Sequence, residues 1–195
     1  MVGAAIRAAD LREGSEAALK AVQLDERNPY AHYALAITSM FAGALERATR
    51  AAETAIALSP SFALGHLALG FARLNAGNAV EAIDQYEHGL RLSPFDPQNF
   101  VWLGNLALAQ YFSGSREAAL QTAMRALSIR PDWVPTLEVL AICCAALERP
   151  DEARAFVEQM RQLEKPPDTL AQMKAHRPEW AAETASMLRK AGLPE

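Results

Sequence analysis

Residues 63–94 read ALGHLALGFARLNAGNAVEAIDQYEHGLRLSP and decide the fold. Apolar residues recur at helical spacing over residues 64–74, and Gly77-Asn78 then provides a tight turn. A second apolar stripe follows over residues 82–92 and ends before a proline. The stretch therefore predicts two helices joined by a tight turn.

The small residues in this stretch have a packing reason. Gly70 and Ala82 fall where the two antiparallel helices cross, and small side chains there let the helix axes approach to roughly 8–10 Å. Neither helix can bury its apolar face alone, so the hairpin must stack on copies of itself.

Copies of the hairpin are present along the chain. The closing proline recurs as Pro60, Pro94 and Pro131, so the period is 34 and then 37 residues. The extra residues are Phe95-Asp96-Pro97, in which Asp96 can cap a helix that starts at Pro97. Two further positions recur with the same period. One is the small residue that opens the second helix, and the other is the turn glycine, which is replaced once by glutamate. Their members are Ala48, Ala82, Ala119 and Ala153, and Gly43, Gly77, Gly114 and Glu148.

These features resemble the tetratricopeptide repeat (TPR) family, whose unit is a 34-residue helix-turn-helix. The resemblance covers Pro29 to about Pro166 in four repeats, at residues 29–62, 63–96, 97–133 and 134–166. It implies an all-α fold, a right-handed α-solenoid in which the first helices of the repeats line a concave face.

The two ends of the chain depart from the full repeat. Residues 1–28 carry only the second half of a repeat, so we expect the array to be the C-terminal part of a longer protein; alternatively, this helix is itself the cap. After the fourth repeat, residues 167–195 predict capping helices, a short one from Asp168 to Ala175 and a last one from Pro178 to Ala191. We expect the last helix to cover the exposed edge of the fourth repeat.

The end of the chain adds a narrower resemblance. The LSP-DP turn between repeats and the ending Leu188-Arg-Lys-Ala-Gly-Leu-Pro-Glu195 look like the C-terminal TPR region of bacterial class III adenylate/guanylate cyclases and of related winged-helix regulators. The paired metal-binding aspartates and alternating strands of a cyclase are absent from the sequence. The resemblance therefore implies a non-catalytic regulatory module of a larger bacterial signalling protein.

Composition excludes several other classes of protein. The formal net charge is −4 with scattered Lys and Arg, which gives no electrostatic footprint for nucleic acid. No apolar run approaches the roughly 20 residues that a membrane span needs, and the start of the chain has no secretory signal pattern. The cysteines, Cys143 and Cys144, are neighbours in one predicted helix and are expected to be small buried side chains. We expect a cytoplasmic protein.

Candidate catalytic groups are few. His32 and His66 occupy the same place in successive repeats, where the family has a bulky packing residue, so a packing role is expected. His88 and His176 have no acidic or cysteine companions at ligand spacing. Because nucleophile arrangements and Gly-rich phosphate loops are also missing from the sequence, we expect no enzyme, no cofactor and no metal.

The remaining candidate is a peptide-binding groove on the concave face. The TPR resemblance carries its positions over as Tyr30, Tyr33, Ile37, Leu64, Leu67, Phe71, Val101, Asn105, Leu108, Glu138 and Ile142. TPR proteins that hold chaperone tails place a lysine/arginine and asparagine clamp there. Only Asn105 matches that clamp, and Tyr33, Leu67 and Gly104 stand where a cation is needed.

Monomers seldom leave such an apolar surface bare, so the groove is expected to bind a partner. An apolar groove without cations favours a partner helix or peptide over an acidic tail. The sequence therefore predicts a non-catalytic protein–protein interaction scaffold with a protein or peptide partner. Two alternatives stay open at this point. These side chains could simply pack against neighbouring helices, or the chain could be a homo-oligomerisation module, for example a homodimer.

Overall fold

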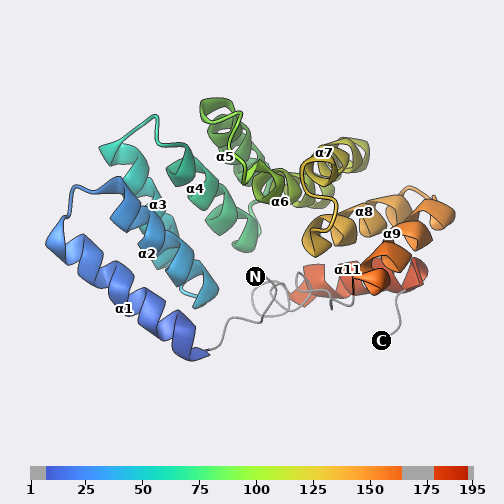
Figure 1. Ribbon diagram of the computed structural model, residues 1–195, viewed down its shortest axis with the longest axis horizontal. Coiled ribbons are helices and arrows are strands. Elements are labelled where there is room, and N and C mark those ends of the chain that lie inside the picture. Colours follow the sequence, from blue (N-terminus) through green and yellow to red (C-terminus); the bar gives the residue numbers. More distant parts are fainter. Residues whose placement is uncertain (1–7, 164–177, 193–195) are drawn as a thin grey trace. The chain divides into compact units, whose positions relative to one another are not determined.

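The computed structural model describes residues 8–163 and 178–192, and within these ranges it contains α-helices and no strand (Figure 1). The all-α prediction is therefore confirmed. The chain divides into two compact units, Met1–Pro94 and Phe95–Glu195, called unit 1 and unit 2 below. Each unit is described by itself.

Unit 1 consists of one helix followed by two helical hairpins. Its helices are α1 (Ala8–Leu24), α2 (Pro29–Phe41), α3 (Leu45–Leu58), α4 (Ala63–Asn75) and α5 (Ala79–Leu92). The closest packing is within the hairpins α2–α3 and α4–α5, and α3 packs on α4 to join them. Helix α1 packs on α2, as a second helix of a preceding hairpin would.

Unit 2 repeats the two-hairpin arrangement and adds a helix at its end. Its described helices are α6 (Asn99–Phe112), α7 (Arg116–Ile129), α8 (Val134–Ala146), α9 (Pro150–Gln162) and α11 (Pro178–Lys190). The hairpins are α6–α7 and α8–α9, joined by packing of α7 on α8. The short helix predicted from Asp168 to Ala175 lies outside the described residues.

The hairpin turns share one backbone geometry. Gly43, Gly77 and Gly114 have φ angles of 75°, 89° and 90°, in the left-handed region that glycine adopts without strain. Glu148 holds the same place in the last hairpin with a φ of 60°. In each turn the amide after this residue donates to a carbonyl at the end of the first helix; for example, Asn78 donates to the Arg73 oxygen at 2.9 Å. The predicted turns are therefore confirmed, and Glu148 keeps the geometry at a conformational cost.

The close helix crossings are also confirmed. Ala48, Ala82, Ala119 and Ala153 are all completely buried. A methyl group added to Gly70 would lie 3.0 Å from Cδ1 of Tyr86, so the two helices of that hairpin meet with no room for a side chain.

The helix starts follow the capping residues with one correction. Asn28 caps α2, because its side-chain oxygen accepts the Tyr30 amide at 3.0 Å. Asp96 accepts the Gln98 amide at 2.7 Å, yet α6 begins at Asn99 and not at Pro97. The Asp96 carbonyl accepts the Asn99 amide at 3.0 Å, so the residues between form a separate turn.

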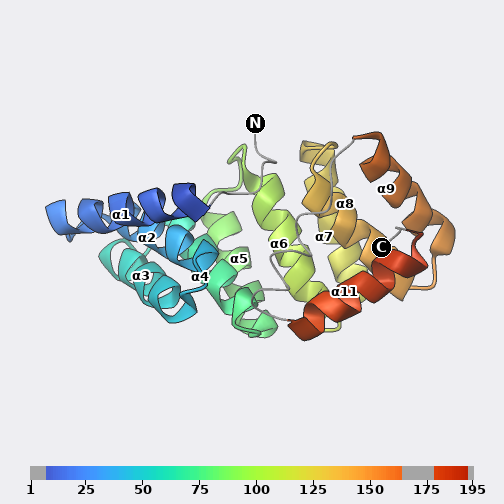
Figure 2. The same cartoon turned by 90° about the horizontal axis from the view of Figure 1, so that it is seen from below.

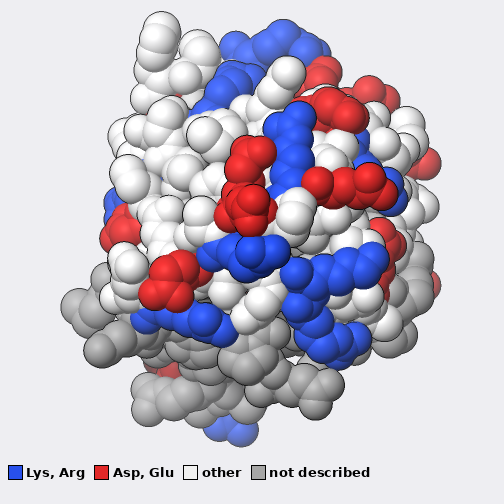
Figure 3. Space-filling model, turned by 90° about the vertical axis from the view of Figure 1, so that its right-hand side faces the viewer, with Lys and Arg blue, Asp and Glu red and all other residues white. Residues whose placement is uncertain are grey.

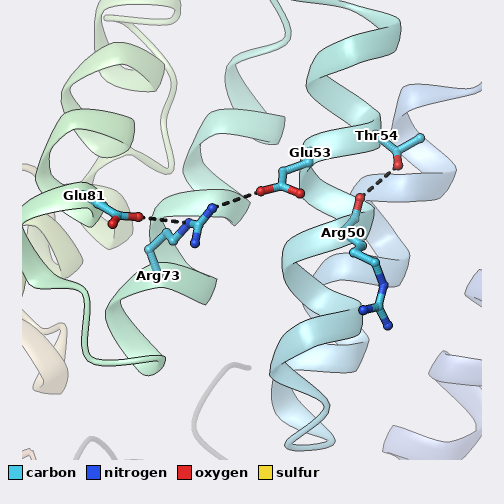
Figure 4. A network of polar contacts seen from close by, with 5 residues as sticks. All are labelled: Arg50, Glu53, Thr54, Arg73 and Glu81. Carbon is cyan, nitrogen blue, oxygen red and sulfur yellow. Dashed lines mark hydrogen bonds and ion pairs between the residues drawn. The ribbon is translucent and has the colours of Figure 1, made fainter.

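An ion-pair network joins the hairpins of unit 1. Arg73 on α4 contacts Glu53 on α3 through Nη2 at 2.9 Å and Glu81 on α5 through Nε at 3.4 Å (Figure 4). Because the arginine side chain is 30% exposed and both carboxylates are more exposed, the pairs are screened by solvent and contribute modestly.

Candidate functional site

In each unit the first helices of the two hairpins form a candidate surface, here called the first-helix face of that unit. Helices α2 and α6 contain no Asp, Glu, Lys or Arg. The only such residue on α4 is Arg73, which forms the ion pairs described above, and the only one on α8 is Glu138, which is 1% exposed. The first-helix face is therefore apolar, as the sequence predicted for the groove.

In unit 1 most of the predicted groove residues keep accessible surface. Tyr30 is 63% exposed, and Tyr33, Ile37, Leu64 and Phe71 are partly buried. Leu67 is the exception at 2% exposed. Its side chain lies over Gly89, where an added methyl would come within 2.7 Å of it, so Leu67 packs inside the hairpin and offers no binding surface.

Aromatic rings gather on this face in unit 1. Tyr30 and Tyr33 both meet Phe62 edge to face, with ring centroids 4.7 Å and 6.3 Å apart. Phe41 meets Phe71 in the same way at 5.8 Å. The groove predicted from the sequence lacks Phe41 and Phe62, although Phe41 recurs two repeats later as Phe112 and was therefore detectable.

In unit 2 the predicted groove residues are mostly covered. Val101 and Asn105 are partly buried, and the Asn105 side-chain amide donates to the Val101 carbonyl of its own helix at 3.1 Å. Leu108 is 6% exposed, and Glu138 and Ile142 are each 1% exposed. The last three residues therefore present no free surface, which corrects their assignment to an open groove.

Helix α11 covers this face of unit 2. It packs against α8 (Figure 2). At the end of α6, Trp180 stacks on Phe112 with ring centroids 3.9 Å apart and planes 9° from parallel. The Tyr111 hydroxyl donates to Glu183 Oε1 at 2.8 Å. The stripe turned toward the unit is buried. It consists of Ala181, Thr184 and Leu188 on α11 and Ala191 directly after the helix, all at most 2% exposed.

This placement differs from the edge-covering role expected of the last helix. A first helix added at the edge would pack mainly on the preceding second helix, as α4 packs on α3 and α8 packs on α7. The main partner of α11 is instead the first helix α8. Contact with α9 is made near the end of α11, where Arg161 Nη2 donates to the Gly192 carbonyl at 2.7 Å. Helix α11 thus behaves as a ligand of the first-helix face.

The contact with α11 changes the titration of Tyr111. Burial is the main cause that raises the pKa of Tyr111, and the hydrogen bond to Glu183 and the charge of that carboxylate raise it further. The phenol therefore stays protonated at physiological pH and is a steady hydrogen-bond donor to Glu183.

The cysteines and the repeated histidines have packing roles, as predicted. Burial raises the pKa of Cys143 to about 12 and that of Cys144 to about 11, so both remain neutral thiols. His32 Nε2 lies 2.9 Å from the Glu26 carbonyl, and His66 Nε2 lies 3.0 Å from the Pro60 carbonyl. Each contact ties the first helix to the preceding loop, and His66 Nδ1 also lies 2.9 Å from Gln85 Oε1 of the second helix.

The charged surface is mixed in sign. On the side of the molecule shown in Figure 3, Lys and Arg alternate with Asp and Glu, without a large patch of either sign among the described residues. Several charges form short-range pairs on α9, such as Arg154 with Asp151 at 3.0 Å and Arg161 with Glu158 at 3.6 Å. This face therefore has no strong preference for a polyanion or a polycation.

Among the described residues, no helix is both long enough and apolar enough to cross a bilayer.

The sequence matches no family model, and no curated protein sequence matches it. Solved structures nevertheless share its fold. The type IV pilus biogenesis factor PilW superposes with a TM-score of 0.74 at 16% identity, covering 95% of this chain and 84% of that one. TTC0263, a thermophilic TPR protein from Thermus thermophilus, gives 0.69 at 21% identity, covering 93% and 92%. YrrB, a TPR protein with an unusual peptide-binding site, gives 0.62 at 20% identity, covering 91% of each chain. These likenesses show that the chain has the all-α helical-repeat fold of TPR proteins.

Proposed function

We propose that the chain is a non-catalytic interaction scaffold that binds a helix of a partner protein on the first-helix face of unit 1. One observation carries the proposal: the chain's own α11 occupies the first-helix face of unit 2, with its apolar stripe buried against α8. Laying the apolar face of an amphipathic helix into a groove is a recurring mode of recognition.

The first-helix face of unit 1 is also apolar, and several of its side chains remain accessible to solvent. Phe41 of unit 1 corresponds to Phe112 of unit 2, which stacks on Trp180. Phe71 lies against Phe41. Tyr30 and Tyr33 add aromatic area next to Phe62. Aromatic anchors on an uncharged surface favour binding through apolar burial, which supports a helix as the ligand in preference to a carboxylate tail.

The wider role follows from the sequence resemblance to the C-terminal regions of bacterial signalling proteins. In the proposal, the scaffold is a cytoplasmic regulatory module that couples a partner to a catalytic or DNA-binding domain. YrrB, which shares this fold, has a peptide-binding site. This supports a peptide segment as the class of ligand in the proposal.

The test is a titration of the full chain with a labelled synthetic peptide that carries residues 178–192. The peptide reports on unit 1, because the tethered α11 competes for unit 2 at an effective concentration of order millimolar. We expect micromolar affinity, since ordering and lost rotational freedom offset much of the buried apolar area. Tyr33→Ala combined with Phe71→Ala should weaken binding, whereas Val80→Ala, at an exposed apolar position of α5, should not.

Salt dependence and self-association complete the test. Raising the salt concentration from about 50 to about 500 mM should change the affinity little, because few exposed charges are neutralised. Binding that is steeply salt-dependent and indifferent to Tyr33 and Phe71 would contradict the proposal. Light scattering against protein concentration tests the alternative, in which the chain is a homo-oligomerisation module and its mass rises with concentration.

A further inference from the structure

We propose that the first-helix face of unit 1 selects a partner helix that resembles α11 but has an apolar residue where α11 has Glu183. This inference rests on the function proposed above and names the chemistry of the ligand. It follows from two neighbouring positions at the end of the first helix, of which one is alike in the two units and the other differs.

The first of these positions is alike in the two units. Phe112 of α6 carries the stacked Trp180 ring, and Phe41 of α2 stands at the corresponding place of unit 1. Phe41 packs against the core cluster of Met40, Ala48 and Ala72 and meets Phe71 edge to face at 5.8 Å. Its side chain is only partly buried, so an aromatic side chain of a ligand can contact it. An aromatic residue equivalent to Trp180 is therefore retained in the predicted ligand.

The second position is different. Tyr111 of α6 donates its hydroxyl proton to Glu183, whereas unit 1 has Met40 at the corresponding place. Met40 is 2% exposed and packs with the buried Ala48 and Ala72, and a thioether has no proton to donate. The nearby Arg47 of α3 uses its Nε proton for Ser39 at 2.8 Å, and the Met40 position itself supplies no donor.

The consequence is a selection against α11 itself. A glutamate docked over Met40 would lose water without gaining the hydrogen bond that Tyr111 supplies in unit 2. An apolar residue there would bury its own surface without giving up a hydrogen bond to water. The predicted ligand thus has an aromatic residue, an apolar residue three positions later, a small one at four and a leucine at eight, following Trp180, Glu183, Thr184 and Leu188. Unit 1 accordingly favours a different protein over α11 of a second copy.

A double-mutant cycle tests this selection. The full chain and its Met40→Tyr variant are each titrated with two labelled peptides of residues 178–192, one natural and one carrying Glu183→Leu. On the natural protein, the Glu183→Leu peptide should bind about tenfold more tightly, as expected for one hydrogen bond to a charged group. On Met40→Tyr, the natural peptide should regain most of that factor. Met124→Tyr, at a partly exposed methionine on α7, is the matched control and should leave the preference unchanged.

The outcomes separate this inference from the proposed function. If Met40→Tyr does not fold, the two peptides on the natural protein still decide the matter. Equal binding of the two peptides, or tighter binding of the natural one, would overturn the inference and leave the proposed function standing, provided that Phe41→Ala weakens both. Failure of both peptides to bind would remove the proposed function as well.

Discussion

Units 1 and 2 contain the same pair of hairpins, but their first-helix faces differ. In unit 2 the face is covered by α11, through the Trp180–Phe112 stack and the Tyr111–Glu183 hydrogen bond. In unit 1 the corresponding face keeps Tyr30 63% exposed and leaves Phe41 and Phe71 partly buried. Residues inside the hairpins therefore specify the fold in both units, whereas the first-helix faces carry residues that differ between the units.

The interior positions are shared between the units. Ala82 in unit 1 and Ala119 in unit 2 are both completely buried at the helix crossing, and the turns at Gly77 and Gly114 have φ angles within a degree of each other. The residues at the end of the first helix are not all shared, since Met40 in unit 1 corresponds to Tyr111 in unit 2. Substitutions at both kinds of position can therefore test the comparison.

The largest expected effect is on the covering helix of unit 2. Leu188 is 1% exposed, so Leu188→Ala should lower the free energy of unfolding of unit 2 by about 2–5 kcal/mol. All three tryptophans, Trp102, Trp133 and Trp180, belong to unit 2, so their fluorescence in a urea titration reports on that unit. Amide hydrogen exchange follows unit 1. Equal loss of protection in α2 and α4 would contradict the assignment of α11 to unit 2.

The next effect should be the same in both units. Ala82→Leu and Ala119→Leu each place a large side chain at a crossing without free space, and each should cost about 1–3 kcal/mol of unfolding free energy. Glu87→Leu, at an exposed position of α5, should stay within about 0.5 kcal/mol. Denaturant unfolding of the three variants measures these differences. A crossing that tolerates leucine in only one unit would show that the hairpins are not equivalent.

A smaller effect, of opposite sign, is expected at the last turn. Glu148 has a φ of 60°, and this left-handed conformation costs a residue with a side chain about 1–2 kcal/mol. Glycine avoids that cost, although its greater freedom in the unfolded chain offsets part of the benefit. Glu148→Gly should therefore stabilise unit 2 by up to about 1 kcal/mol, seen as a higher melting temperature. Gly114→Ala, at the same place one hairpin earlier, is expected to do the reverse. Destabilisation by Glu148→Gly would mean that the glutamate makes a favourable contact there.

The smallest effect concerns the ion pairs of unit 1. Arg73→Ala removes contacts to Glu53 and Glu81, which are both well exposed, so the loss should be at most about 1 kcal/mol and should shrink at high salt. Urea unfolding at low and high salt measures it. A larger loss that persists in salt would indicate that the arginine stem contributes through packing.

The helices could be predicted well from the sequence because repetition fixes them several times over. Helix α2, for example, begins at Pro29, where the first predicted repeat starts, and the predicted turn at Gly43 separates it from α3. The start of α6 could not be predicted as well, because Asp96 forms a turn of its own before Asn99. Local signals of this kind compete, and tertiary packing decides between them.

The candidate site was predictable only in part. The apolar character of the first helices is visible in the sequence, and Tyr30, Tyr33 and Phe71 do keep accessible surface. The burial of Leu67 depends on the absence of a side chain at Gly89 in the neighbouring helix. The burial of Glu138 and Ile142 accompanies the packing of α11 on α8. That contact joins segments far apart in the sequence through side-chain fit, which periodicity does not encode.

The most direct test of the account is a map of where a helix binds. The full chain is labelled with nitrogen-15, and its amide resonances are followed while the unlabelled Glu183→Leu peptide of residues 178–192 is added. Chemical-shift changes are expected on α2 and α4, around Phe41 and Phe71. The amide resonances of α6 and α8 should stay unchanged, because α11 remains bound there. Shifts confined to α3 and α5, or to α6 and α8, would contradict the claim that unit 1 holds the available first-helix face.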